Sequence, residues 1–391
     1  MPGLAGGPPL HLYLLVGLVA AAVSYLVTPA VCALSRHIGA IDVPTDRKVH
    51  LAPTPTLGGI AVYAAFVAAC LFAAAFPSFR EAFRFSELVG LVVGGIVPLA
   101  LGIADDRREL SPPAKLAGQV FAAGILFLSG IRMTYFWLPG IGVLSVSQDV
   151  SAILTILWIV FLMNAVNFID GLDGLCAGLT AIAAGSLFVY FTRLPTEFLG
   201  SAPIAPLVCV ALVGACIGFL RYNFNPARIF LGDSGAMPLG YLLAGATISV
   251  IGTFNGPGSA GGRVALPMVF MPIVFLALPI TDLVFAVVRR LATGRPIHTP
   301  DKEHIHHRLM RFGHSQREAV LVMYGWALLL AAGLVMAGVM PWGAYALAFA
   351  VAGGTVGLLT FAPRLRAPRQ ARGQVPQPAE GEVAPPPAQR V

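Results

Sequence analysis

Six carboxylates of this sequence lie at or near the ends of long apolar runs: Asp105, Asp106, Asp170, Asp173, Asp233 and Asp282. At the centre of a membrane helix, an ionised carboxylate costs about 2.5–3.5 kcal/mol on insertion scales. Such acids must therefore line a hydrated cleft and have their charge balanced. A divalent cation together with basic side chains supplies that balance. Clustered acids, a metal and nearby cations suit a substrate that carries a pyrophosphate.

The densest polar stretch combines two amides and two carboxylates at three-residue steps: Asn164, Asn167, Asp170 and Asp173. If the preceding helix runs on to Asn167, the two amides share one face of it. Asp170 and Asp173 would then sit at the start of the next helix, where backbone N–H groups favour anions. A polar loop without chemistry is the alternative.

Two other acidic segments repeat this pattern. Asp105 and Asp106 are adjacent at the end of an apolar run, and neighbouring acids often meet Mg²⁺, which also takes substrate phosphates as ligands. A solvated cluster in which they pair with Arg107, Arg108 or Lys115 is the alternative. Asp233 and Ser234 occupy the position of an N-cap for the apolar run that follows. Phe230 could stack on a base or serve as an interfacial anchor.

Basic residues lie in two segments that could bind phosphates. Arg47, Lys48 and His50 precede the glycine pair Gly58-Gly59, although Arg47 and Lys48 also obey the positive-inside rule. Three histidines and an arginine occur together at His304, His306, His307 and Arg308. A zinc site is the alternative there, but structural zinc usually has four ligands at wider spacing and no cysteine is near. Imidazoles beside an arginine suit phosphate oxygens better.

The elements that position these residues are membrane helices. The 391 residues are 57% hydrophobic and 11% charged, whereas charged residues make up about 25% of soluble domains. Apolar runs long enough to cross a bilayer predict an all-α, polytopic protein with about eleven transmembrane helices. Their approximate limits are 10–34, 57–76, 88–103, 115–130, 150–163, 174–192, 204–220, 236–253, 265–288, 319–339 and 342–361.

The distribution of Lys and Arg predicts the orientation. With the N-terminus outside and the C-terminus in the cytoplasm, cytoplasmic segments hold 20 of the 25 basic residues. The net charge of +7 is then a topology signal, and nucleic-acid binding is not expected. We expect a membrane domain over residues 1–363 and a disordered, Pro-rich cytoplasmic tail over 364–391. The five scattered cysteines are interpreted as small apolar residues.

Segments from Lys48 to Arg308 resemble, in order, those of the polyprenyl-phosphate N-acetylhexosamine-1-phosphate transferases of glycosyltransferase family 4. They are Pro-Thr-Leu-Gly-Gly at 55–59, Asp105-Asp106, Asn164-x-x-Asn167-x-x-Asp170-Gly-x-Asp173-Gly-Leu, Phe230-Leu-Gly-Asp233-Ser-Gly and His304-x-His306-His307-Arg308. The last segment looks like the undecaprenyl-phosphate N-acetylglucosamine-1-phosphate transferase branch, because the pentapeptide enzymes carry a different histidine-rich loop.

This resemblance implies transfer of N-acetylglucosamine 1-phosphate from the UDP-sugar to undecaprenyl or decaprenyl phosphate, with release of UMP. It implies an Mg²⁺-dependent site, with Mn²⁺ as a substitute, on the cytoplasmic face of the inner membrane. Asp233 and Asn167 are expected at the metal. The expected catalytic residues are Asp105, Asp106, Asp170, His306 and His307. The expected substrate-binding residues are Lys48, His50, Asn164, Asp173, Phe230, His304 and Arg308.

Three interpretations remain beside this one. Another UDP-sugar, such as UDP-N-acetylmuramoyl-pentapeptide, would use the same chemistry. A cation-coupled transporter would also need intramembrane acids, but near the bilayer midplane. A homodimer is compatible with the sequence.

Asp282 lies too far from Arg289 for an i, i+4 pair, and a structural hydrogen bond to a neighbouring helix is favoured over catalysis.

Overall fold

The fold is taken from a computed structural model that describes residues 8–44, 52–138, 142–193, 204–251, 309–310, 312–336 and 341–366. Several sequence predictions lie outside these ranges. They concern Lys48, His50, Asp282, His304, His306, His307 and Arg308, the expected span at 265–288, and the tail beyond residue 366.

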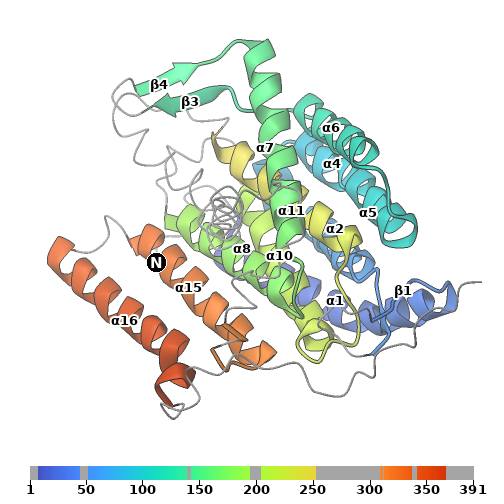
Figure 1. The fold of residues 1–391 in the computed structure, drawn as a ribbon. Helices are drawn as coiled ribbons and strands as arrows, with labels where there is room; N and C mark the ends of the chain where they lie inside the picture. The colour runs from blue at the N-terminus through green and yellow to red at the C-terminus, as the bar shows by residue number, and fades with distance from the viewer. Residues whose placement is uncertain are drawn as a thin grey trace, which may run out of the picture.

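The described chain is mostly helical. Its helices are α1 (Leu10–His37), α2 (Gly59–Ala74), α3 (Pro77–Ala82), α4 (Phe85–Gly94), α5 (Ile96–Arg108), α6 (Pro112–Leu128), α7 (Gln148–Ile169), α8 (Leu175–Arg193), α10 (Ile204–Asn223), α11 (Asp233–Ile251), α15 (Gln316–Met336) and α16 (Trp342–Arg366). Figure 1 shows α8, α10 and α11 in the middle of the bundle and α16 on its outside.

Seven spans in the described part are long and apolar enough to cross a membrane, and α2 and α6 are shorter apolar helices. The protein is therefore a multi-pass membrane protein. Every predicted span inside the described ranges coincides with a helix, except that the third is formed by α4 and α5 together, with Gly95 between them. The total of about eleven stays a prediction.

Two small antiparallel sheets accompany the helices. Strands β1 (Ile41–Asp42) and β2 (Thr54–Pro55) pair Ile41 with Pro55, beside the N-terminus of α2. Strands β3 (Tyr135–Leu138) and β4 (Gly142–Ser145) form a hairpin that lies to one side of the start of α7 in Figure 1. The fold is thus mostly α, and these sheets are the part that the all-α prediction did not include.

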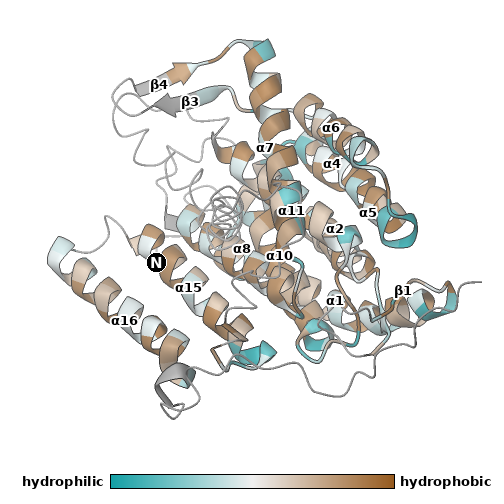
Figure 2. Ribbon diagram, viewed as in Figure 1, coloured by the Kyte–Doolittle hydropathy of each residue, from teal (hydrophilic) through white to brown (hydrophobic). Residues whose placement is uncertain are grey.

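The polar residues of interest come together at one end of the bundle. The C-termini of α5, α7 and α10 meet the N-termini of α2, α6 and α11 there, as the contacts described below show. Figure 2 shows hydrophobic helices with hydrophilic segments at loops such as the α5–α6 turn. We call this end of the bundle the polar end.

The α7–α8 junction differs in detail from its prediction. Helix α7 continues to Ile169, so Asn164 and Asn167 do share a helical face, as expected. Helix α8 begins only at Leu175. Asp170 is the C-cap of α7, and Asp173 lies in the following turn, so neither acid stands at the N-terminus of α8. The glycines at 171 and 174 extend this turn, and Gly174 has a φ of +80°.

Candidate active site

Asp233 is the centre of the polar end, because donors from two other helices reach one of its oxygens. The Lys115 ammonium from α6 lies 3.0 Å from Asp233 Oδ2 and 2.5 Å from Asp105 Oδ2. Asn167 on α7 donates its Nδ2–H to the same Asp233 oxygen at 3.2 Å. Asp105 also accepts the backbone N–H of Leu110 at 2.7 Å. Four helices thus supply one acid–cation–amide cluster, which we call the Asp233 cluster: Asp105, Lys115, Asn167 and Asp233.

Asp106 has a different environment from its neighbour Asp105. Its Oδ1 accepts the backbone N–H of Asp233 at 2.9 Å, and its Oδ2 accepts the N–H of Ser234 at 3.2 Å. The carboxylate therefore caps the N-terminus of α11, where free N–H groups favour an anion. The prediction that Asp233 and Ser234 provide this cap was wrong. Asp233 is the first helical residue, and the cap comes from α5.

Glycines make this cap geometrically feasible. A Cβ on Gly102 of α5 would stand 2.3 Å from Asp233 O, and one on Gly59 of α2 would stand 2.1 Å from Gly235 N. Gly232 has a φ of +69°, and its Cβ would stand 2.5 Å from Asp106 Oδ2. Backbones of α2 and α5 thus approach the start of α11 more closely than any side chain would allow.

Asp170 lies beside this cluster without a salt bridge in the described residues. It accepts a hydrogen bond from the backbone N–H of Gly232. Desolvation by the surrounding protein, together with the neighbouring carboxylates of Asp106 and Asp233, raises the pKa of Asp170 to about 7. Asp170 is thus an acid whose charge a cation bound in this region would stabilise.

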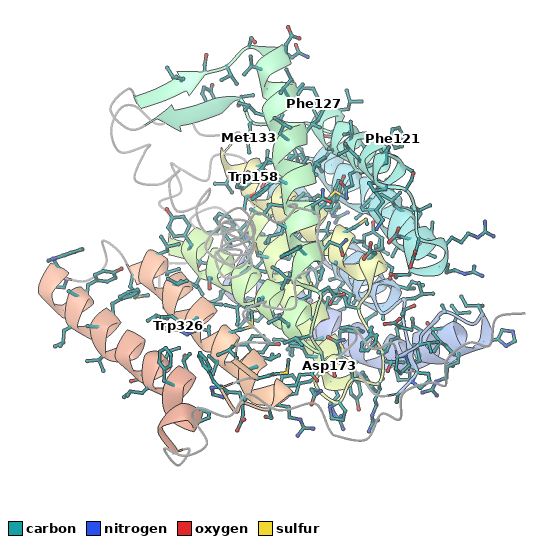
Figure 3. All side chains as sticks on the ribbon, viewed as in Figure 1. Phe121, Phe127, Met133, Trp158, Asp173 and Trp326 are labelled. Atoms are coloured by element: carbon teal, nitrogen blue, oxygen red, sulfur yellow. The ribbon has the colours of Figure 1, made fainter. Side chains whose placement is uncertain are left out.

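Asp173 holds a second cluster at the same end, and Figure 3 labels it there. Its Oδ2 accepts Asn225 Nδ2–H at 2.8 Å and the backbone N–H of Ala227 at 3.0 Å. Asn225 also donates to Gln316 Oε1 at 2.8 Å, and Arg317 Nε donates to the Asn225 carbonyl at 2.5 Å. The loop between α10 and α11 is therefore attached both to the α7–α8 turn and to the start of α15.

Phe230 is held in the same loop by its backbone. Its N–H donates to Pro55 O at 2.8 Å, and its carbonyl accepts the N–H of Gly58 at 3.0 Å. The Pro55–Gly59 segment and the Phe230–Gly235 segment, which the sequence singled out separately, are therefore hydrogen-bonded neighbours. The role of Phe230 in stacking on a base stays a prediction.

Asn164 pairs with a residue that the sequence analysis did not select. Asn164 Nδ2 donates to Gln119 Oε1 at 2.7 Å and to Val160 O at 2.8 Å, and Gln119 Nε2 donates to Asn164 Oδ1 at 3.2 Å. Both N–H groups of Asn164 are thus used inside the protein. Its substrate-binding role stays a prediction that this geometry does not favour.

Sequence reasoning also missed Lys115 as a site residue. It considered Lys115 only as a member of a solvated cluster with Asp105 and Asp106, yet Lys115 bridges Asp105 to Asp233, 118 positions away. The available signal was a lysine in the first turn of an apolar helix that directly follows two acids. For Gln119 the signal was an amide one helical turn further along the same apolar helix.

The donor set of the Asp233 cluster fits a hard divalent cation. Carboxylates and an amide are oxygen ligands, and the Lys115 ammonium shows that a cation is stabilised between Asp105 and Asp233. Within the described ranges, no three His, Cys, Asp or Glu side chains lie close enough together to hold an ion alone. A metal here would take the remaining ligands from water and substrate phosphates, as Mg²⁺ commonly does.

Comparison with known proteins places the chain in a family. Residues 88–251, which run from within α4 to the end of α11 and include the whole Asp233 cluster, match glycosyl transferase family 4. The decaprenyl-phosphate N-acetylglucosaminephosphotransferase of Mycobacterium tuberculosis is 37% identical over 84% of this chain and 83% of its own length. The chain belongs to glycosyl transferase family 4. The resemblance drawn from the sequence motifs is thereby confirmed.

Two further relatives mark branches of this family. A probable undecaprenyl-phosphate N-acetylglucosaminyl 1-phosphate transferase of Bacillus subtilis is 34% identical over 76% of this chain and 77% of its own. The phospho-N-acetylmuramoyl-pentapeptide-transferase of Mycolicibacterium smegmatis is 29% identical over 82% of this chain and 94% of its own. The chain is thus more similar to these N-acetylglucosamine phosphate transferases than to that pentapeptide transferase.

Proposed function

We propose that this protein transfers N-acetylglucosamine 1-phosphate from UDP-N-acetylglucosamine to undecaprenyl or decaprenyl phosphate, and so starts a lipid-linked glycan of the cell envelope. The observation that carries the proposal is the convergence of Lys115, Asn167 and Asp105 on Asp233 at the polar end of an apolar bundle. The names and identities of the relatives support this choice of donor sugar and acceptor. The site lies on the cytoplasmic face of the inner membrane in this proposal.

The reaction exchanges one phosphoanhydride for another. An oxygen of the lipid phosphate attacks the phosphorus that bears the sugar, the bond from that phosphorus to the bridging oxygen breaks, and UMP departs with that oxygen. A phosphate nucleophile is already ionised near neutral pH, so alignment and charge balance matter more than proton removal. Asp105 then acts by holding Lys115, with no need to remove a proton.

Mg²⁺, or Mn²⁺ in its place, would be held by Asp233 with Asn167 and would neutralise charge on the transferred phosphoryl group. In the described chain the side-chain partners of the Lys115 ammonium are the carboxylates of Asp105 and Asp233. In this proposal Lys115 neutralises the lipid phosphate or the departing UMP. The predicted roles of His306, His307 and Arg308 at the diphosphate belong to this proposal and lie outside the described residues.

A bilayer location also suits the acceptor. The polar end gives a soluble nucleotide sugar access to the Asp233 cluster. The apolar helix surfaces that continue from it can accommodate a polyprenyl chain. In the described chain Asp105, Asp106, Asp170, Asp173 and Asp233 lie at one end of the bundle, whereas a cation-coupled transporter would place its acids near the middle. Transport is therefore the weaker hypothesis, and a homodimer stays a prediction.

The decisive test is Asp233→Asn in purified, detergent-solubilised protein, assayed for UMP release from UDP-N-acetylglucosamine with undecaprenyl phosphate. We expect loss of at least about 100-fold in kcat, the usual scale for removing a group that stabilises transition-state charge. Unchanged turnover would overturn the proposal. A panel that includes UDP-N-acetylmuramoyl-pentapeptide tests the sugar, and uptake into liposomes without UMP release would indicate transport instead.

A further inference from the structure

Helices α6 and α7 each carry one residue of the Asp233 cluster and, one turn deeper, one member of an amide pair. On α6 these are Lys115 and Gln119, four residues apart, and on α7 they are Asn167 and Asn164, three residues apart. Such spacings place both members on the same helical face. The two helices therefore contact each other through two polar levels. The outer level meets at Asp233 Oδ2, and the inner level is the Gln119–Asn164 pair.

The inner level is reciprocal, and it joins a buried amide, Gln119, to an exposed one, Asn164. Each amide donates to the other, at 2.7 and 3.2 Å, and only 1% of Gln119 is exposed. A reciprocal amide pair forms in only one register of the two helices, because a shift along either axis breaks both hydrogen bonds together. An apolar contact would tolerate such a shift, since apolar packing has no preferred direction.

The outer level depends on that register. Lys115 Nζ and Asn167 Nδ2 reach the same oxygen of Asp233, at 3.0 and 3.2 Å, from two different helices. A displacement of α6 against α7 by a fraction of a turn would move at least one of these donors out of hydrogen-bond range. The Asp233 oxygen itself is held independently, because Asp106 caps the first turn of α11.

We propose that Gln119 is a positioning residue of the transferase site. Through Asn164 it sets the register of α6 and α7, so that Asn167 of α7 stays beside Asp233, where these two side chains would hold the divalent cation, and Lys115 of α6 stays at the same site. Gln119 itself touches neither metal nor substrate in this proposal. The inference rests on the proposed metal-dependent transfer at the same site.

The test begins with Gln119→Leu, which keeps the approximate size of the side chain and removes both hydrogen bonds to Asn164. Residues that orient metal ligands typically contribute 10–100-fold to metal affinity or activity. We expect the affinity for Mn²⁺, measured by electron paramagnetic resonance titration of purified protein without substrates, to fall about tenfold. We expect kcat to fall by a similar factor while KM for UDP-N-acetylglucosamine changes less than twofold.

A swap of the pair separates positioning from general loss of structure. Gln119→Asn leaves the pair one methylene too short, and Asn164→Gln leaves it one methylene too long. The double variant Gln119→Asn/Asn164→Gln restores the summed length and both amides. We expect it to recover Mn²⁺ affinity to within about threefold of wild type, although each single variant loses more. Absence of this recovery would overturn the proposal.

The chain offers a matched control on the same helix. Trp158 of α7, labelled in Figure 3, donates its Nε1–H to Thr247 Oγ1 of α11 at 3.1 Å, about two turns before Asn164. Thr247→Val removes this interhelical hydrogen bond without touching the Asp233 cluster. We expect unchanged Mn²⁺ affinity. Equal losses of Mn²⁺ affinity in Thr247→Val and Gln119→Leu would show that any weakened helix contact has this effect, and would overturn the specific role.

Failure of this inference is distinguishable from failure of the proposed function. If Asp233→Asn abolishes Mn²⁺ binding and turnover while Gln119→Leu has neither effect, only the positioning role is wrong. If Asp233→Asn leaves turnover intact, the proposed function is wrong whatever Gln119 does.

Discussion

Asp105 and Asp106 are neighbours in the sequence, yet they do different work in the structure. Asp105 accepts the backbone N–H of Leu110 through Oδ1, and its Oδ2 pairs with the Lys115 ammonium. Asp106 is bound through both oxygens to backbone N–H groups of Asp233 and Ser234. A carboxylate with one oxygen paired to a side chain can exchange that partner during a reaction, whereas a carboxylate held through both oxygens by a helix N-terminus is part of the framework. We therefore expect Asp105 to be the reactive acid of the pair and Asp106 the architectural one.

The largest effect we expect on the reactive side of this comparison is that of Lys115→Met. The variant removes the charge and keeps most of the apolar stem, so kcat should fall about 100-fold or more if Lys115 neutralises developing charge. Thermal stability should change little, because an ion pair with partial exposure contributes only about 0–1 kcal/mol. Turnover assays and thermal unfolding in detergent check both halves. A large loss of stability with preserved turnover would show that Lys115 has a structural role in place of the reactive one.

For Asp106, the acid that caps α11, we expect the opposite of Lys115→Met: Asp106→Ala should affect stability more than activity. Loss of a helix cap costs about 0.5–2 kcal/mol, and Asp106 caps two N–H groups in a crowded region. We expect a lower midpoint of thermal unfolding and a loss of activity that Asp106→Asn, which keeps an acceptor, partly reverses. If Asp106→Asn abolishes turnover while stability is unchanged, Asp106 belongs with the reactive acids.

The protonation of Asp170 predicts how cation affinity and stability depend on pH. Since its pKa is raised to about 7, it is mostly neutral at pH 6 and mostly ionised at pH 8. Cation affinity should therefore rise about tenfold between these values in the wild type. The folded state binds this proton more tightly than the unfolded chain does, so metal-free protein should lose stability as pH rises from about 4 through 7. Mn²⁺ titration and thermal unfolding across this range test both trends, and Asp170→Asn is the reference that lacks the contribution of this carboxyl to the pH dependence.

The smallest effect is expected at the second cluster. Asn225→Ala removes the side-chain hydrogen bonds to Asp173 and Gln316 but leaves the backbone bond from Ala227 to Asp173. If this loop forms part of the nucleotide site, KM for UDP-N-acetylglucosamine should rise about three- to tenfold. Mn²⁺ affinity should stay unchanged, because the Asp233 cluster is not involved. Steady-state kinetics with matched Mn²⁺ titrations check this, and a change in kcat alone would argue against a nucleotide site there.

Local sequence rules predicted much of this molecule, because they concern residues that are near each other along the chain. Apolar run length identified the described membrane helices, and three-residue spacing correctly placed Asn164 and Asn167 on one face of α7. The ordered motifs identified the family. The α7–α8 turn was displaced from its prediction because Gly171 and Gly174 allow a longer non-helical segment than the apolar pattern indicates.

Composition and motif spacing by themselves therefore determined the membrane class, the family and most of the candidate residues. Tertiary structure alone decided which partners each residue has there. Lys115 meets Asp233 across 118 positions, Asn167 meets it across 66, and Asp106 caps α11 across 127. Such contacts arise from the close approach of helix backbones at glycines, which no local spacing encodes. The same packing gives two adjacent aspartates, alike in sequence, different partners and different expected roles.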